Sequence, residues 1–63
     1  MNDDLFPQDA RFADWIAELE RELTMRRRLY PRWVANGKMK QEAADRRIRV
    51  MEELLDYMKE QRG

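Results

Sequence analysis

Two rows of carboxylates are the residues in this 63-residue chain whose spacing best suits chemistry. Each row repeats every four residues, which places its members on one face of a helix; the rows are Asp14, Glu18 and Glu22, and Glu52, Asp56 and Glu60. Such carboxylates can bind a hard cation, but a di-metal site in a helical bundle normally adds a Glu-x-x-His motif, and the chain has no histidine. We interpret both rows as solvated helix faces and expect no metal and no cofactor.

Side chains for nucleophilic catalysis are also scarce. The chain has no cysteine, histidine or serine, and Thr24 is its only aliphatic hydroxyl. The usual pairs of nucleophile and base cannot be assembled from these residues. The composition therefore predicts a protein that is not an enzyme.

The charges are sorted along the chain, although the formal net charge is zero. Residues 1–25 contain seven acidic and two basic residues, and residues 50–63 contain four acidic and two basic ones. Residues 26–49 contain nine basic and two acidic residues, a net charge of +7. If the chain folds back near its centre, it has a basic tip and an acidic base, a polarised field that indicates a charged partner.

The order of charges in the second half of the chain opposes the helix dipole. Basic residues near a helix C-terminus are favourable, so the arginines at 26–32 need no functional explanation. In the second half, basic residues come first and acidic residues follow, which is unfavourable at both ends of a helix. Two explanations stay open: the basic tip binds a partner, or it lies along the acidic base of a second copy in an antiparallel dimer.

Two stretches have the periodicity of amphipathic helices. Apolar residues step by three and four from Phe12 to Trp33, and again from Ala44 to Met58. Pro31 predicts a kink or break near the end of the first helix, Gly37 predicts its end, and Lys40 is a poor N-cap for the second. We expect an N-terminal arm at 1–9 and one domain at 10–62, with a first helix at about 10–36, a connector at 37–40 and a second helix at about 41–62.

Two helices joined by a short connector form an antiparallel hairpin. So short a chain buries few apolar side chains, and without cysteine or histidine it lacks disulfides and most metal sites. We therefore predict an all-α hairpin that forms a homodimer, as a four-helix bundle. The expected core and dimer residues are Phe12, Ile16, Leu19, Leu23, Tyr30, Ile48, Met51, Leu55 and Met58.

Arg26 interrupts the apolar stripe of the first helix. We expect its aliphatic stem to cover the core while its charged head reaches water. The alternative is a buried pair that fixes the register: reflection of the chain about residue 38 places position 26 opposite about position 50, so Glu52 or Glu53 could meet its guanidinium.

The segment ELTMRRRLYPRWV at 22–34, followed by GKM at 37–39, ADRRI at 44–48 and VME at 50–52, resembles small uncharacterised proteins encoded by proteobacterial phages and prophages. The resemblance covers about Glu22 to Tyr57. Members of that group tend to have Ser or Thr where this chain has Lys40, which here weakens the helix cap and enlarges the positive patch. The resemblance implies a phage origin and assigns no activity to any residue.

Together these features predict a phage accessory protein that binds and modulates a host protein. The expected partner-binding residues are Arg27, Arg28, Arg32, Trp33, Lys38 and Lys40. The alternative is a nucleic-acid-binding protein that uses the same tip, although the acidic base would repel a duplex and no helix-turn-helix spacing is present. With no apolar run of membrane-spanning length and no signal-peptide pattern, we expect a cytoplasmic protein of the bacterial host cell.

Overall fold

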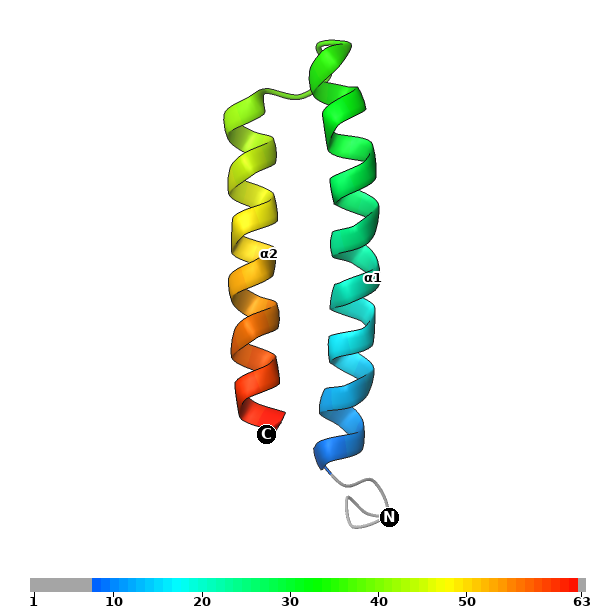
Figure 1. Ribbon diagram of the computed structural model, residues 1–63, viewed down its shortest axis with the longest axis vertical. Coiled ribbons are helices and arrows are strands. Elements are labelled where there is room, and N and C mark those ends of the chain that lie inside the picture. Colours follow the sequence, from blue (N-terminus) through cyan, green and yellow to red (C-terminus); the bar gives the residue numbers. More distant parts are fainter. Residues whose placement is uncertain (1–7, 63) are drawn as a thin grey trace.

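The computed structural model describes residues 8–62, which form an antiparallel pair of helices (Figure 1). Helix α1 spans Gln8–Ala35 and helix α2 spans Gln41–Arg62, and no strand occurs within these residues. The predicted all-α hairpin is confirmed. The second helix has the expected bounds, whereas α1 begins at Gln8, so residues 8 and 9 belong to the helix and the rest of the expected arm lies outside the described residues.

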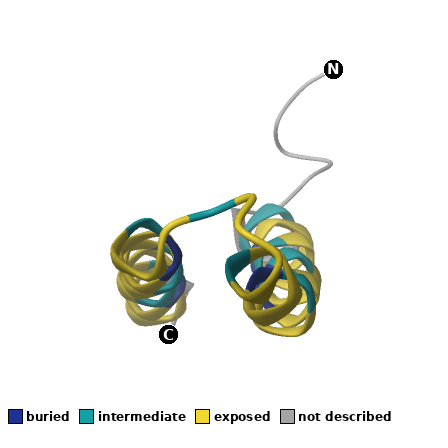
Figure 2. Cartoon of the chain, turned by 90° about the horizontal axis from the view of Figure 1, so that it is seen from above, coloured by how far each residue is buried: buried dark blue, intermediate teal, exposed yellow. Residues whose placement is uncertain are grey.

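The two helices contact each other through one narrow apolar seam. Its fully buried residues are Ile16, Leu23, Tyr30, Ala44 and Leu55, each between 3% and 7% exposed. Leu19, Ile48, Met51 and Met58 pack against this cluster and are half-buried, as is Phe12. Figure 2 shows that the buried positions lie on the sides of α1 and α2 that face each other. The seam follows from the three-and-four spacing, because residues seven apart return to the same side of a helix.

Helix α1 ends in a Schellman motif centred on Gly37. Gly37 has a positive φ of 81°, the conformation that glycine adopts without a steric penalty. The amide of Lys38 donates to the carbonyl of Trp33 at 2.8 Å, and the amide of Gly37 donates to the carbonyl of Val34 at 3.1 Å. These are the two bonds of the motif, and they turn the chain toward α2.

Pro31 lies inside α1 without interrupting it. The sequence predicted a break there, and the stop-and-restart form of that prediction is wrong, because α1 continues as one helix to Ala35. Pro31 removes one backbone donor near the C-terminal end, where few turns remain to be disrupted. Beyond it, the rings of Tyr30 and Trp33 pack at a centroid distance of 5.7 Å, which holds this last turn on the hairpin.

The hairpin is a single layer of two helices, and a thin one. It measures 49 × 18 × 14 Å, and its shortest dimension is close to the diameter of one helix, about 10–12 Å. Its accessible surface is 5102 Å² for a mass of 7.8 kDa, whereas a compact monomer of that mass exposes about 4,400 Å². No helix of residues 8–62 is both long and apolar enough to cross a membrane.

Candidate functional site

Six cations gather at the end of the hairpin where the chain turns, and we call them the basic tip. All six are exposed, and their side chains make no ion pair or hydrogen bond within residues 8–62. They come from the last turns of α1, the connector and the first turns of α2: Arg28, Arg32, Lys38, Lys40, Arg46 and Arg47.

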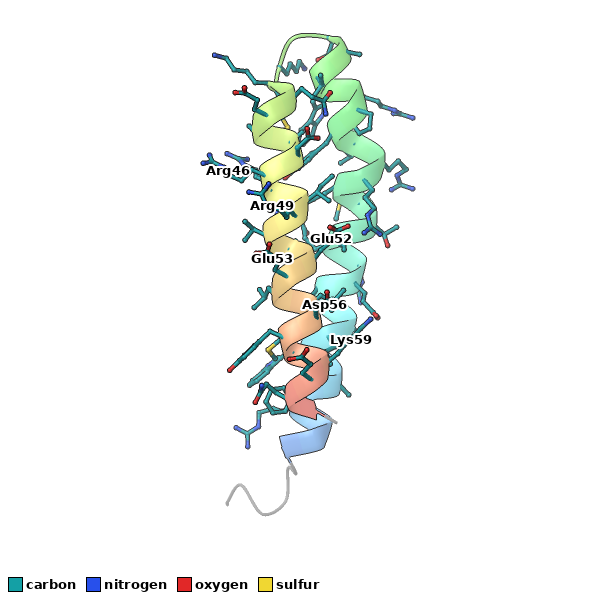
Figure 3. All side chains as sticks on the ribbon, turned by 60° about the vertical axis from the view of Figure 1, so that its left-hand side comes forward. Arg46, Arg49, Glu52, Glu53, Asp56 and Lys59 are labelled. Carbon is teal, nitrogen blue, oxygen red and sulfur yellow. The ribbon has the colours of Figure 1, made fainter. Side chains whose placement is uncertain are left out.

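The fold brings the basic tip together because the connector is short. The last turn of α1 and the first turn of α2 are joined by residues 36–40 alone, so the two helix ends that carry these cations lie side by side (Figure 1). A shallow hollow between Lys40 and Arg46, lined also by Glu42 and Ala43, gives this end a concave element. In Figure 3 the side chain of Arg46 extends away from the hairpin into solvent.

Other basic residues of the two helices are paired, in contrast to those of the basic tip. Within α1, Arg21 pairs with Glu18 at 2.9 Å, and within α2, Arg49 lies 3.9 Å from Glu53. Lys59 reaches across to Glu20 of α1 at 3.2 Å. The unpaired positive charge of the described helices therefore belongs to the half of the hairpin that contains the turn.

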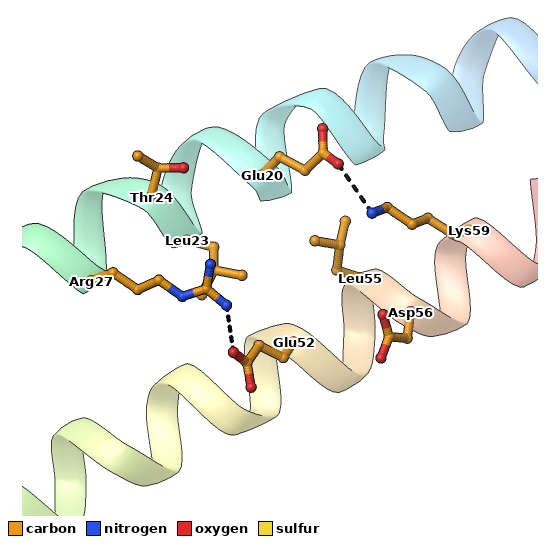
Figure 4. Close-up of a pocket in the computed structure, with 8 residues that line it drawn as sticks. All are labelled: Glu20, Leu23, Thr24, Arg27, Glu52, Leu55, Asp56 and Lys59. Carbon is orange, nitrogen blue, oxygen red and sulfur yellow. Dashed lines mark hydrogen bonds and ion pairs between the residues drawn. The ribbon is translucent and has the colours of Figure 1, made fainter.

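Arg27 differs from the other predicted partner-binding residues. Its guanidinium donates to Glu52 and joins α1 to α2 (Figure 4). Arg27 stays half-exposed, but it is a structural ion-pair partner rather than a free cation of the tip. The sequence missed Arg46 and Arg47 as members of the site, although their position at the positive end of the α2 dipole was the available signal.

Arg26 pairs within its own helix. Its Nε atom donates to Glu22 at 2.9 Å, and its side chain is 26% exposed. The stem of Arg26 is partly covered while its head pairs at the surface, in agreement with the expected role. The alternative, a pair with Glu52 or Glu53, is wrong, because Glu52 binds Arg27 and Glu53 lies near Arg49.

The aromatic residues at the turn have different environments. Tyr30 is buried in the seam, whereas Trp33 is 37% exposed. Trp33 therefore presents part of its ring beside the basic tip while the rest packs on Tyr30. An exposed aromatic ring beside arginines is a composition enriched in interface hot spots.

One broad face of the hairpin is polar. A groove along it is lined by Glu20, Leu23, Thr24, Arg27, Glu52, Leu55, Asp56 and Lys59 (Figure 4). Two ion pairs, Arg27 with Glu52 and Lys59 with Glu20, cross between the helices on this side. No group of three or more carboxylates within residues 8–62 is close enough to hold a metal ion, so the groove has no cation-binding arrangement. It serves to align the helices.

The opposite broad face is apolar. Successive residues of a helix are about 100° apart, so Trp15, Leu19 and Trp33 lie on the other side of the buried seam of α1 from Glu20 and Arg27. In an antiparallel pair the corresponding sides of both helices share one face, and α2 contributes apolar side chains to it. We call this surface the apolar face and define it by Trp15, Leu19, Val50, Leu54 and Tyr57. The Arg26–Glu22 ion pair of α1 lies on the same side, because Arg26 is seven residues from Leu19.

Comparison with models of protein families, with curated proteins and with solved structures finds no match to this chain.

Proposed function

We propose that this chain is a non-enzymatic protein-binding module whose basic tip docks on an acidic surface of another protein. The observation that carries the proposal is the difference in pairing: the cations of the tip have no ion-pair partner within residues 8–62, whereas Arg21, Arg26, Arg27, Arg49 and Lys59 are paired. Clustered like charges repel one another in the free protein. An acidic partner relieves this repulsion and is attracted over a distance, which accelerates association.

The tip also has the means to make an apolar contact. Trp33 exposes part of its ring next to Arg32, and a partly buried tryptophan loses little conformational entropy when a partner covers it. We infer an interface in which the cations steer and orient the partner and Trp33 supplies the anchor. In the same proposal the hairpin forms a homodimer, which covers apolar side chains that one chain leaves exposed.

The biological setting rests on the resemblance of residues 22–57 to phage and prophage proteins. We propose an accessory protein that acts in the bacterial cytoplasm by binding a host protein. Modulation of a host protein needs only a surface and no catalytic group, which suits a chain without histidine, cysteine or serine.

The test compares charge reversal at the tip with charge reversal elsewhere. Proteins are captured from bacterial lysate and quantified by mass spectrometry. Three tagged baits are compared: the wild-type protein, the variant R28E/R32E/K40E and the control R21E/R49E. Arg21 and Arg49 are exposed and make ion pairs only within their own helices. We expect a partner that wild type and control retain and that the tip variant loses, with unchanged helicity in all three. Equal capture by the tip variant would contradict the proposal.

Nucleic acid is the second candidate partner, because the tip combines four arginines and two lysines without ion-pair partners in the described residues. Contacts to phosphates alone give binding that fades as salt rises, whereas specific recognition requires contacts to base edges. Binding to a 20-bp duplex is therefore measured by fluorescence anisotropy at 50 and 200 mM salt. We expect weak binding that is lost at the higher salt; tight binding to a defined sequence at 200 mM would favour nucleic acid as the partner.

A further inference from the structure

The apolar face contains large side chains that one hairpin leaves uncovered. Trp15 is 46% exposed, Leu54 44% and Tyr57 57%, and Val50 is also exposed. Leu54 and Tyr57 lie within one turn of each other on α2, and Trp15 lies on the matching side of α1. A group of exposed large apolar side chains on one side of a small protein indicates an interface.

The polar face, on the other side of the hairpin, is unsuited to packing against an apolar surface. Its seam is crossed by the two ion pairs that join the helices, and Thr24 and Asp56 lie beside them (Figure 4). Burial of these groups against an apolar partner would remove their hydration without replacing it. The two faces of the layer therefore differ in what they can pack against.

The dimensions of the face fit a second copy of the chain. α1 has 28 residues and is therefore about 42 Å long, and the hairpin is 18 Å wide. The projected area is about 750 Å², close to the roughly 800 Å² per partner of a stable protein–protein interface. Two such layers, packed face to face, give the four helices of a bundle.

The charges decide how the second copy is oriented. Residues 26–49, around the turn, carry a net charge of +7, whereas the far end, residues 8–25 and 52–62, carries nine acidic and four basic residues. In a parallel dimer like charges would meet at both ends. In an antiparallel dimer each basic tip lies beside the acidic base of the other copy, which is attractive at both ends.

From these observations we propose that two copies pack antiparallel through the apolar face, so that the dimer presents one basic tip at each end. The inference rests on the proposed homodimer and adds its face and its orientation. It makes the protein bivalent: two copies of an acidic partner, or two sites on one large partner, can be engaged at once, which strengthens binding through effective concentration.

The face is tested with a matched pair of variants. L54E places a charge on the apolar face, and A17E places the same charge at Ala17, which is exposed and lies seven residues before Thr24, on the polar side of α1. Sedimentation equilibrium should give a dimer for wild type and A17E. For L54E we expect a dissociation constant at least about 100-fold higher, because each interface would bury two unpaired charges. An unchanged L54E dimer, or a wild-type monomer, would overturn the proposal.

The orientation is tested with one spin label per chain. Gln41, the first residue of α2, is exposed, and the chain has no cysteine, so Q41C is labelled at a single position. In an antiparallel dimer the two labels are separated by about the length of α2, roughly 33 Å, whereas in a parallel dimer they lie within about 20 Å, two neighbouring helix widths. Pulsed electron paramagnetic resonance distinguishes these distances, and a short one would overturn the antiparallel arrangement.

The tests of the dimer can be distinguished from the test of partner binding at the basic tip. R28E/R32E/K40E should lose the captured partner and still dimerise through the apolar face, with a higher dissociation constant because its tip no longer attracts the acidic base of the other copy. L54E should become monomeric and still bind that partner, with the weaker retention of a single site. Loss of partner binding in L54E without loss of the dimer would show that the apolar face receives the partner instead of a second copy.

Discussion

Gly37 determines where α1 ends, and its role is one of backbone conformation alone. A Cβ atom at this position would meet no atom within 4 Å, so steric contact with the rest of the protein does not require glycine. The positive φ of 81° does, because an L-residue in the left-handed region brings its Cβ close to the carbonyl oxygen.

We predict that G37A lowers the free energy of unfolding by about 1–2 kcal/mol, the cost of the left-handed conformation for a residue with a Cβ. G37N should lose less, because asparagine tolerates this conformation better than alanine. Chemical denaturation at one fixed protein concentration measures both. A G37A variant as stable as wild type would show that the Schellman motif contributes nothing to the hairpin.

The element with the weakest boundary is α2. The carbonyl of Lys40 accepts the first helical bond, from the amide of Ala44 at 3.0 Å, which makes Lys40 the N-cap. Its side chain has no oxygen with which to bind the free amides of the first turn. The positive charge is also unfavourable at this end of the dipole. Lys40 is therefore an unfavourable N-cap for α2, and it is also a member of the basic tip.

We therefore predict that K40S stabilises the protein while weakening partner binding. A serine cap contributes about 1 kcal/mol relative to a residue that cannot cap, and the same change removes one cation from the tip. K38S is the control, because Lys38 lies outside α2 and its substitution removes charge without adding a cap. Thermal or chemical unfolding should separate the two variants. If K40S and K38S have equal stability, capping does not limit α2.

At the scale of the whole molecule, two ion pairs and one apolar seam fix the register of the helices. Arg27 with Glu52 and Glu20 with Lys59 lie on the same face, seven residues apart in each helix, so both pairs report one alignment. Leu23 and Leu55 lie between them in the buried cluster. The seam supplies the free energy of association and the ion pairs select the register.

A double-mutant cycle measures how strongly the Arg27–Glu52 pair couples the helices. The side chains are 53% and 44% exposed, so we predict a coupling energy of about 0.2–1 kcal/mol, which falls as salt is raised. The variants are R27A, E52A and R27A/E52A, with unfolding followed at low and at 500 mM salt. R26A/E52A with its single variants is the control cycle and should give no coupling, since Arg26 binds Glu22. Equal coupling in both cycles would contradict the observed register.

The helices, the turn between them and the division of charge along the chain could all be predicted from local patterns in the sequence. These properties are local: the apolar spacing from Phe12 to Trp33 specifies one side of a helix, and Gly37 specifies where that helix ends. The middle of the chain is basic and its ends are acidic, so a chain that folds back near residue 38 has a basic tip and an acidic base. Residues such as Arg28, Arg32 and Lys40 could therefore be identified as tip residues before the fold was known.

Which side chains meet across the hairpin depends on the tertiary structure. The observed pairs place residue 27 opposite 52 and residue 20 opposite 59, whereas simple reflection about residue 38 would place them opposite 49 and 56, an offset of three residues. Because neighbouring residues on a helix point about 100° apart, Arg27 faces Glu52 across the hairpin while Arg26 points to the other side and pairs with Glu22. Trp15, Leu54 and Tyr57 lie on the side away from the two ion pairs that join the helices. Register depends on how the Gly37 turn and the Leu23–Leu55 packing position the helices together, which no periodicity within one helix specifies.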